Sequence, residues 1–144
     1  MKIVDANVLL HAYNRSAPLH AEAREWLESA LSQDETVGLA WVVLLAFLRI
    51  STNPRAMTDP VSVERGCEVI RQLLEYDPVR IVQPGPEHWL QMERILLKLG
   101  AGGNLTADAH LAALAIEHGA TLVSYDTDFA RFDHLQWTTP RESA

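Results

Sequence analysis

Short apolar runs of strand-forming residues alternate with longer stretches of helical periodicity along the whole chain. The short runs predict strands at 2–4, 36–39, 80–82, 121–125 and 135–137. The longer stretches predict a short helix at 8–10, a helix from Pro18, and helices over 41–50, 60–76, 86–99 and 105–118. Strands that alternate with helices form a mainly parallel central sheet flanked by helices. We therefore predict an α/β fold of three layers.

The chain length of 144 residues suits one domain, and no repeat or linker divides it, so we expect a single domain over 1–144. Cys67 is the only cysteine, which excludes an internal disulfide and a cysteine-based zinc site. The longest apolar run, 39–48, is half of the ~20 residues that a membrane span needs. No signal-like segment opens the sequence, and we expect a cytoplasmic protein.

Several details of the helices follow from residue type. Asn7 is expected to cap the short helix at 8–10. Gly119 is a natural residue to end the helix over 105–118. The helix over 60–76 is expected to bury the stripe formed by Val63, Cys67, Ile70 and Leu74. All four tryptophans occupy apolar positions and are expected in the core: Trp26, Trp41, Trp89 and Trp137.

Two aspartates directly follow predicted strands. Asp5 follows the first strand, and Asp126 closes the strand over 121–125. Strand periodicity places Ser124 and Asp126 on the same side. In parallel sheets, ligands bind beyond the carboxyl ends of the strands. Asp5 and Asp126 are therefore candidate functional residues, although each is also suited to a turn or a cap, and Asp128 to a helix cap.

Asp108 is harder to explain as a purely structural residue. It heads an apolar stripe that continues through Leu111, Ala112, Ala115 and Ile116. An ionised aspartate on a buried stripe needs a cation, hydrogen-bond donors or a raised pKa, because its desolvation is costly. We interpret Asp108 as a functional carboxylate near the start of its helix, where the helix dipole favours negative charge.

Three aspartates that converge on one pocket repel each other unless a cation lies between them. Lys2 and Lys98 are the only lysines, and neither is placed to reach the pocket. Mg²⁺ and Mn²⁺ prefer oxygen ligands, and such ions polarise phosphodiesters and activate water. The formal charge of −7 argues against nucleic-acid binding by bulk electrostatics but permits such a local acidic site.

Other polar residues carry weaker signals. Arg49 lies on the buried helix over 41–50, where it could pair with the acidic pocket, contact a phosphate or form a structural ion pair. The six histidines have no metal-like spacing, and most are expected to be solvated, with His11 the nearest to the pocket. The sequence contains no glycine-rich phosphate loop and no serine-nucleophile motif.

Three segments, taken together, resemble the motifs of PIN-domain nucleases. Segment 3–10 (IVDANVLL) resembles their opening strand, 104–115 (NLTADAHLAALA) their third-acid helix, and 122–129 (LVSYDTDF) their last strand and turn. The order, the spacing and the length of the whole chain are most similar to those of the VapC toxins of bacterial toxin–antitoxin pairs. The resemblance implies an endoribonuclease that requires Mg²⁺ or Mn²⁺ and cuts tRNA, rRNA or mRNA.

The resemblance also implies partners and roles for individual residues. A cognate antitoxin protein would silence the enzyme, which would form a homodimer. Asp5, Asp108 and Asp126 would be catalytic metal ligands. The supporting residues would be Asp128 as a further ligand, Ser124, and Asn7, which would orient Asp5.

The sequence departs from the family pattern at one position. Relatives commonly carry a glutamate before a Phe-Leu-Arg-like segment, and here Ala46 precedes Phe47, Leu48 and Arg49. Ala46 and the acidic composition motivate an alternative function, a catalytically weakened PIN-like module that binds RNA or antitoxin. A phosphoacceptor receiver domain also gathers aspartates at a sheet edge, but it needs a lysine near the last strands, which this chain lacks.

Overall fold

A computed structural model of the chain describes residues 1–143. Its strands are β1 (Lys2–Val4), β2 (Val37–Leu39), β3 (Val79–Ile81), β4 (Thr121–Val123) and β5 (Trp137–Thr138). Its α-helices are α1 (Ala6–Tyr13), α2 (His20–Leu31), α3 (Trp41–Ser51), α4 (Val63–Glu75), α5 (His88–Leu99) and α6 (Leu105–Glu117). A short 3₁₀ helix, η1 (Thr127–Arg131), follows β4.

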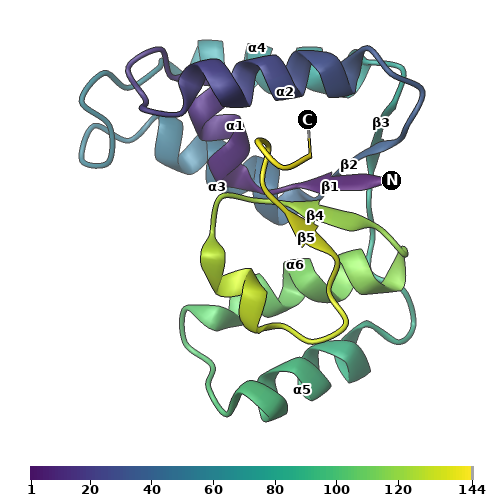
Figure 1. The fold of residues 1–144 in the computed structure, drawn as a ribbon. Helices are drawn as coiled ribbons and strands as arrows, with labels where there is room; N and C mark the ends of the chain where they lie inside the picture. The colour runs from purple at the N-terminus through teal and green to yellow at the C-terminus, as the bar shows by residue number, and fades with distance from the viewer. Residues whose placement is uncertain (144) are drawn as a thin grey trace.

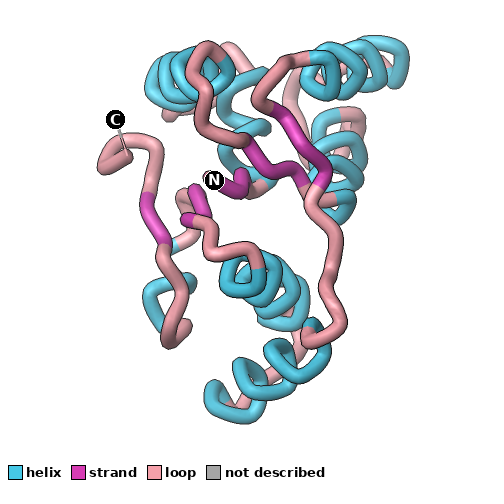
Figure 2. The backbone as a smooth tube through the Cα atoms, turned by 90° about the vertical axis from the view of Figure 1, so that its right-hand side faces the viewer, coloured by secondary structure: helices cyan, strands magenta, loops and turns pink. Residues whose placement is uncertain are grey.

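The strands form one parallel sheet in the order β3-β2-β1-β4-β5. Figure 1 shows α1, α2 and α4 above the sheet and α5 and α6 below it. Figure 2, turned by 90°, shows the strands between these two groups of helices. The predicted α/β fold with a parallel sheet flanked by helices is confirmed.

The order of the strands creates a crevice at the carboxyl ends of β1 and β4. From β1 the chain builds the sheet outward through β2 and β3, and it then crosses to the other side of β1 to form β4. Val4 of β1 pairs with Val123 of β4, and the Asp5 N–H donates to the Val123 carbonyl at 3.0 Å. In open parallel sheets, ligands bind at such a switch point. Asp5 and Ser124, the residues that follow the two strands, lie at its edge.

The core surrounds β1, β4 and α6. Ile3, Leu122 and Val123 are fully buried, as is expected of central strands covered on both faces. Helix α6 is buried around most of its circumference, with five consecutive buried residues at 111–115. Gly119 ends this helix with a left-handed φ of 59°, as predicted, because glycine adopts that conformation without steric cost.

Several predicted element boundaries are wrong. Helix α1 begins at Ala6, two residues earlier than expected, because the side chain of Asp5 rather than Asn7 caps it. Helix α2 begins at His20, beyond Pro18. Strand β4 ends at Val123, so Ser124 belongs to the following loop. Each difference lies at the end of an element, where sequence periodicity defines the boundary least well.

The predicted buried stripe of α4 is also wrong. The helix buries Gly66, Val69 and Leu73, whereas the Val63 and Cys67 side chains are exposed. Gly66 packs closely against α3, because a Cβ atom at this position would lie 2.6 Å from Cδ1 of Leu48 and the leucine side chain would have to shift. The face of α4 that carries Gly66 therefore lies against α3, and Cys67 faces away from it.

Two of the four tryptophans lie outside the core. Trp26 is buried and Trp137 half-buried, but Trp41 and Trp89 are 49% and 64% exposed. They occupy the first turns of α3 and α5, where apolar periodicity alone does not distinguish core from surface. Within residues 1–143, no helix has the length and apolar character that crossing a bilayer requires.

Candidate active site

Asp5 is held in place at the carboxyl end of β1 by three hydrogen bonds. Its Oδ1 accepts the Ala6 N–H at 2.7 Å, which caps α1. Its Oδ2 accepts the Ser124 hydroxyl at 2.7 Å and Nδ2 of Asn7 at 3.2 Å. The donors come from α1 and from the loop after β4, so the carboxylate bridges the two sides of the switch point.

Ser124 and Asn7 connect this carboxylate to Asp126. The buried Ser124 Oγ accepts hydrogen bonds from Nδ2 of Asn7 and from the Asp126 N–H, both at 3.0 Å. Oδ1 of Asn7 accepts the Tyr125 N–H at 3.1 Å. Oδ1 of Asp126 accepts the Asp128 N–H at 2.9 Å and caps η1. The structure thus brings Asp5, Asp126 and their neighbours into one hydrogen-bonded network.

Asp108 completes a group of acidic side chains with Asp5, Asp126 and Asp128. It lies half-buried in the first turn of α6. Burial raises the pKa of its carboxyl to about 6, and the charges of Asp126, Asp5 and Asp128 contribute to the rise. Asp108 therefore lies close enough to the other three carboxylates for their charges to act on it.

The pKa of Asp5 is also raised, first by burial and then by the charge of Asp126. The hydrogen bonds from Ser124 and the Ala6 N–H oppose this rise, because they stabilise the charged form. Burial and repulsion therefore act against ionisation of Asp5, and two positioned donors act for it.

The donor set suits a hard divalent cation. Carboxylate oxygens are the ligands of Mg²⁺ and Mn²⁺, and none of the four carboxylates has an ion-pair partner within residues 1–143. In the same part of the chain, no three acidic, histidine or cysteine side chains lie close enough to hold one ion directly. Mg²⁺ keeps several of its waters, and these can bridge an ion to the more distant carboxylates.

Neither Arg49 nor Ala46 takes part in this hydrogen-bonded network within residues 1–143. The Arg49 side chain is exposed on α3 and makes no ion pair or hydrogen bond with any residue in 1–143. Ala46 is half-buried and packs against the core, so α3 brings no carboxylate from position 46. His11 lies one helical turn beyond Asn7 on α1, and its ring packs edge-on against Tyr125 at 5.2 Å.

A second polar cluster was missed by the sequence analysis. Nδ1 of His88 lies 2.6 Å from Oε2 of Glu117, and Nε2 of His88 lies 2.8 Å from Nδ1 of His110. The expectation that most histidines are solvated is wrong for His88 and His110, which are half-buried. Their partners come from α5 and α6, so no spacing within either helix could have indicated the contact.

The raised pKa of Asp108 predicts how stability depends on pH. The folded state binds a proton between the ordinary carboxyl pKa of 3.8 and about 6, whereas the unfolded state does not. The charged form therefore destabilises the metal-free fold above pH 6, and this cost disappears as pH falls towards 4. Two pKa units correspond to ~3 kcal/mol, and solvent screening of a half-buried group reduces this to ~1 kcal/mol.

In chelator at pH 7, Asp108→Asn should therefore raise the free energy of unfolding by ~1 kcal/mol, measured by urea denaturation. The difference from the wild type should vanish near pH 4. A variant that is less stable than the wild type at pH 7 would contradict the electrostatic description of this group.

Comparison with known proteins identifies the family. The PIN domain family matches residues 2–135. Ribonuclease VapC37 of Mycobacterium tuberculosis is 44% identical over 140 residues, which cover 97% of this chain and 97% of that protein. Ribonuclease VapC43 of the same organism is 39% identical, covering 97% of this chain and 95% of the relative.

Among solved structures, M. tuberculosis VapC20, described as a sarcin-ricin loop cleaving toxin, superimposes with a TM-score of 0.69. The superposition covers 94% of this chain and 99% of VapC20 at 16% identity, and thus supports the fold. The family match and the close relatives show that the chain belongs to the PIN-domain family and, within it, to the VapC ribonucleases.

Proposed function

We propose that the chain is an endoribonuclease, the toxin of a toxin–antitoxin pair, that hydrolyses RNA phosphodiester bonds at Asp5, Asp108 and Asp126 with Mg²⁺ or Mn²⁺. The observation that carries this proposal is the hydrogen-bonded network that joins Asp5 and Asp126 through Ser124 and Asn7 at the switch point of the sheet. Asp108 lies close enough to this network for the charges of Asp126 and Asp5 to raise its pKa further, after burial. Such a group accumulates negative charge where a polyanionic substrate must bind. A divalent cation bound there would neutralise part of this charge and reduce the repulsion between the site and the substrate.

The relatives support RNA as the substrate. The two M. tuberculosis relatives are named ribonucleases, and VapC20 cleaves the sarcin-ricin loop. When bound, the divalent ion would polarise the phosphodiester and lower the pKa of water. Asp5, Asp108 and Asp126 would hold it, and Asp128 would support them. Ser124 and Asn7 donate hydrogen bonds to the Asp5 carboxylate and would orient it towards the ion, as outer hydrogen-bond donors do in metal sites.

Ala46 favours one alternative, a catalytically weakened module that binds RNA or antitoxin. Its methyl group supplies no oxygen ligand from α3, so the aspartates alone would hold the ion. Mg²⁺ requires few protein carboxylates, which favours the active enzyme over the weakened module.

Metal binding tests the proposed ligands. Asp5→Asn, Asp108→Asn and Asp126→Asn each keep the size of the side chain and remove one charge. Each should weaken the binding of Mn²⁺ by about tenfold or more, because the ion loses one charged ligand and even the loss of an outer hydrogen-bond partner has an effect of this size. Calorimetric titration measures the change, and the exposed Asp34→Asn serves as a control of equal charge. Unchanged binding in all three variants would refute the site.

The proposed partners are a cognate antitoxin and a second copy of this chain. VapBC2 from Rickettsia felis is a toxin–antitoxin neighbour, solved bound to promoter DNA. It superimposes with a TM-score of 0.69 over 96% of this chain and 97% of its own chain, at 18% identity. The exposed apolar side chains of Trp41, Leu45 and Trp89 leave surface that such partners could cover.

The net charge of −7 predicts how the antitoxin associates. A basic antitoxin segment that enters the acidic site should be steered electrostatically, so its association rate should fall as salt rises. The dissociation rate should change less with salt. Stopped-flow mixing over a salt series measures both rates. An association rate that is independent of ionic strength would contradict an acidic docking site.

A further inference from the structure

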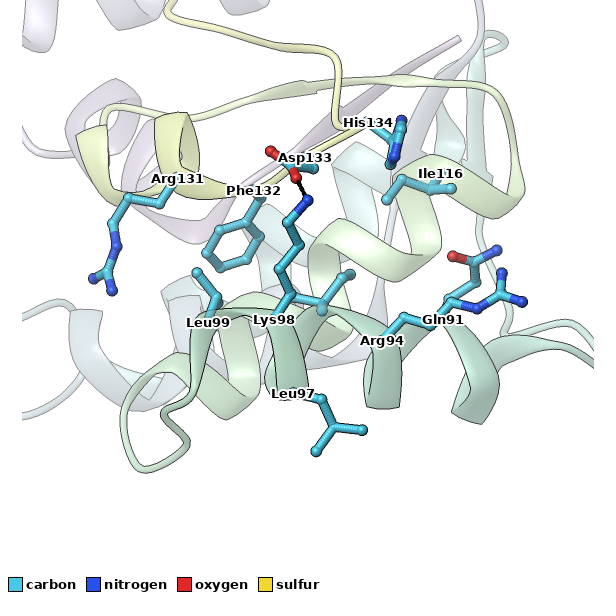
Figure 3. Close-up of a pocket in the computed structure, with 11 residues that line it drawn as sticks. Gln91, Arg94, Leu97, Lys98, Leu99, Ile116, Arg131, Phe132, Asp133 and His134 are labelled. Atoms are coloured by element: carbon cyan, nitrogen blue, oxygen red, sulfur yellow. Dashed lines mark ion pairs between the residues drawn. The ribbon is translucent and has the colours of Figure 1, made fainter.

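A groove lies between α5 and the segment from η1 to β5. It has a volume of about 610 Å³, and we call it the α5–η1 groove. Figure 3 shows Arg131 at one end and Arg94 towards the other, with Lys98 between them. Arg94 and Lys98 are four residues apart on α5 and therefore lie on the same side of that helix. Arg131 is the last residue of η1.

The groove is basic in an otherwise acidic protein. The chain has 12 lysines and arginines against 19 aspartates and glutamates, yet three of these basic residues line this groove. The one carboxylate in its lining is Asp133, which forms an ion pair with Lys98. Arg94 and Arg131 are exposed and have no ion-pair partner within residues 1–143. Two guanidinium groups are therefore free to bind an anion.

The floor of the groove is apolar. Ile95, Ile116 and Phe132 contribute to its lining beneath the charged rim. Single-stranded nucleic acid combines phosphates, which arginine binds, with bases, which pack on apolar and aromatic surfaces. A groove with guanidinium groups at its rim and an apolar floor matches both parts of a nucleotide.

The groove adjoins the candidate active site through η1. Asp126 caps this 3₁₀ helix, Asp128 lies in its first turn, and Arg131 ends it. Five residues of 3₁₀ helix span roughly 10 Å, which is the reach of a few nucleotides. A strand whose phosphate lies at the aspartates can therefore continue into the groove.

We propose that the α5–η1 groove binds the single-stranded RNA next to the scissile phosphate, with Arg94 and Arg131 contacting phosphates. The inference rests on the proposed ribonuclease function and adds the path of the substrate. It assigns a substrate-binding role to α5, which contributes none of the four carboxylates. It also explains how a chain of net charge −7 attracts a polyanion close to its acidic site.

The test compares two double variants of equal charge. Arg94→Gln/Arg131→Gln removes the free guanidinium groups of the groove. Arg55→Gln/Arg71→Gln removes two exposed arginines that lie outside it and have no ion-pair partner within 1–143. Fluorescence anisotropy with short and long single-stranded oligoribonucleotides, in chelator to prevent cleavage, measures the Kd over a salt series.

The groove variant should raise the Kd of the long oligonucleotide by about tenfold and abolish the gain in affinity with length. Loss of two phosphate contacts should reduce the slope of log K against log salt by about 1.4. With metal present, its KM for the long RNA should rise. The control variant should match the wild type throughout, and circular dichroism should show that both variants are folded.

Equal affinities of the groove variant and the control variant would overturn the inference. Competition gives a second test. If a polyglutamate peptide of matched charge displaces the labelled RNA as effectively as unlabelled RNA does, the groove is a general anion site and the inference is overturned. Groove-dependent RNA binding by a wild type that cleaves no RNA with either metal would sustain the inference and refute the proposed function. The two failures are therefore distinguishable.

Discussion

Asp108→Asn is expected to lower RNA cleavage by about a thousandfold or more while the chain stays folded. The substitution removes the charge of a carboxyl whose pKa is raised to about 6, first by burial and then by the neighbouring aspartates, and with it a proposed ligand of the divalent ion. Loss of transition-state stabilisation by a positioned charge has effects of this size. The rate of cleavage of a labelled RNA by purified protein measures the loss.

The same variant has a matched control and a cellular readout. Asp34→Asn removes an exposed carboxylate far along the sequence from the site and should cleave as the wild type does. Expression of the wild type without antitoxin should arrest growth, and Asp108→Asn should relieve the arrest. Equal arrest by the wild type and Asp108→Asn would contradict catalysis as the cause.

Ser124→Ala is expected to lower cleavage by about 10- to 100-fold, the range found when an outer hydrogen bond to a metal ligand is lost. The Ser124 hydroxyl donates to Asp5 and accepts from Asn7 and the Asp126 N–H, so one substitution removes three hydrogen bonds. The pKa of Asp5 should rise, because the Ser124 hydrogen bond lowers it. Stability should fall by about 1–3 kcal/mol, since buried polar groups lose their partners.

Ser51→Ala separates the loss of this network from the loss of any buried serine. Ser51 is also buried, but its hydroxyl lies 3.5 Å from the Leu48 carbonyl within α3. Ser51→Ala should keep its activity, measured in the same cleavage assay. If both serine variants cleave RNA equally fast, the proposed orientation of Asp5 is wrong.

The order of the elements and the parallel sheet could be predicted because each depends on local periodicity. Which face of each helix is buried could not always be predicted. Helix α4 buries Gly66 rather than Cys67 and packs this position against Leu48 of α3, where an added Cβ would lie 2.6 Å from the leucine Cδ1 and require that side chain to shift. Such a contact with a neighbouring helix cannot be seen in the hydrophobic pattern of α4 itself.

Asp5, Asp108 and Asp126 could be singled out as candidates from their positions after strands and at the head of an apolar stripe. The connections among them depend on distant residues and could not be predicted. Asn7 contacts Ser124, which lies 117 residues away in the sequence. Arg94 and Arg131 likewise share a groove only because α5 packs beside the segment that follows η1. Their spacing in the sequence gives no such signal.

The most direct test of the central claim is cleavage of RNA by the purified protein after removal of metal. Protein dialysed against chelator should leave a labelled RNA intact, and addition of Mg²⁺ or Mn²⁺ should restore cleavage to the wild type but not to Asp108→Asn. Cleavage that persists in chelator, or no cleavage with either ion, would contradict a divalent-metal ribonuclease site at Asp5, Asp108 and Asp126.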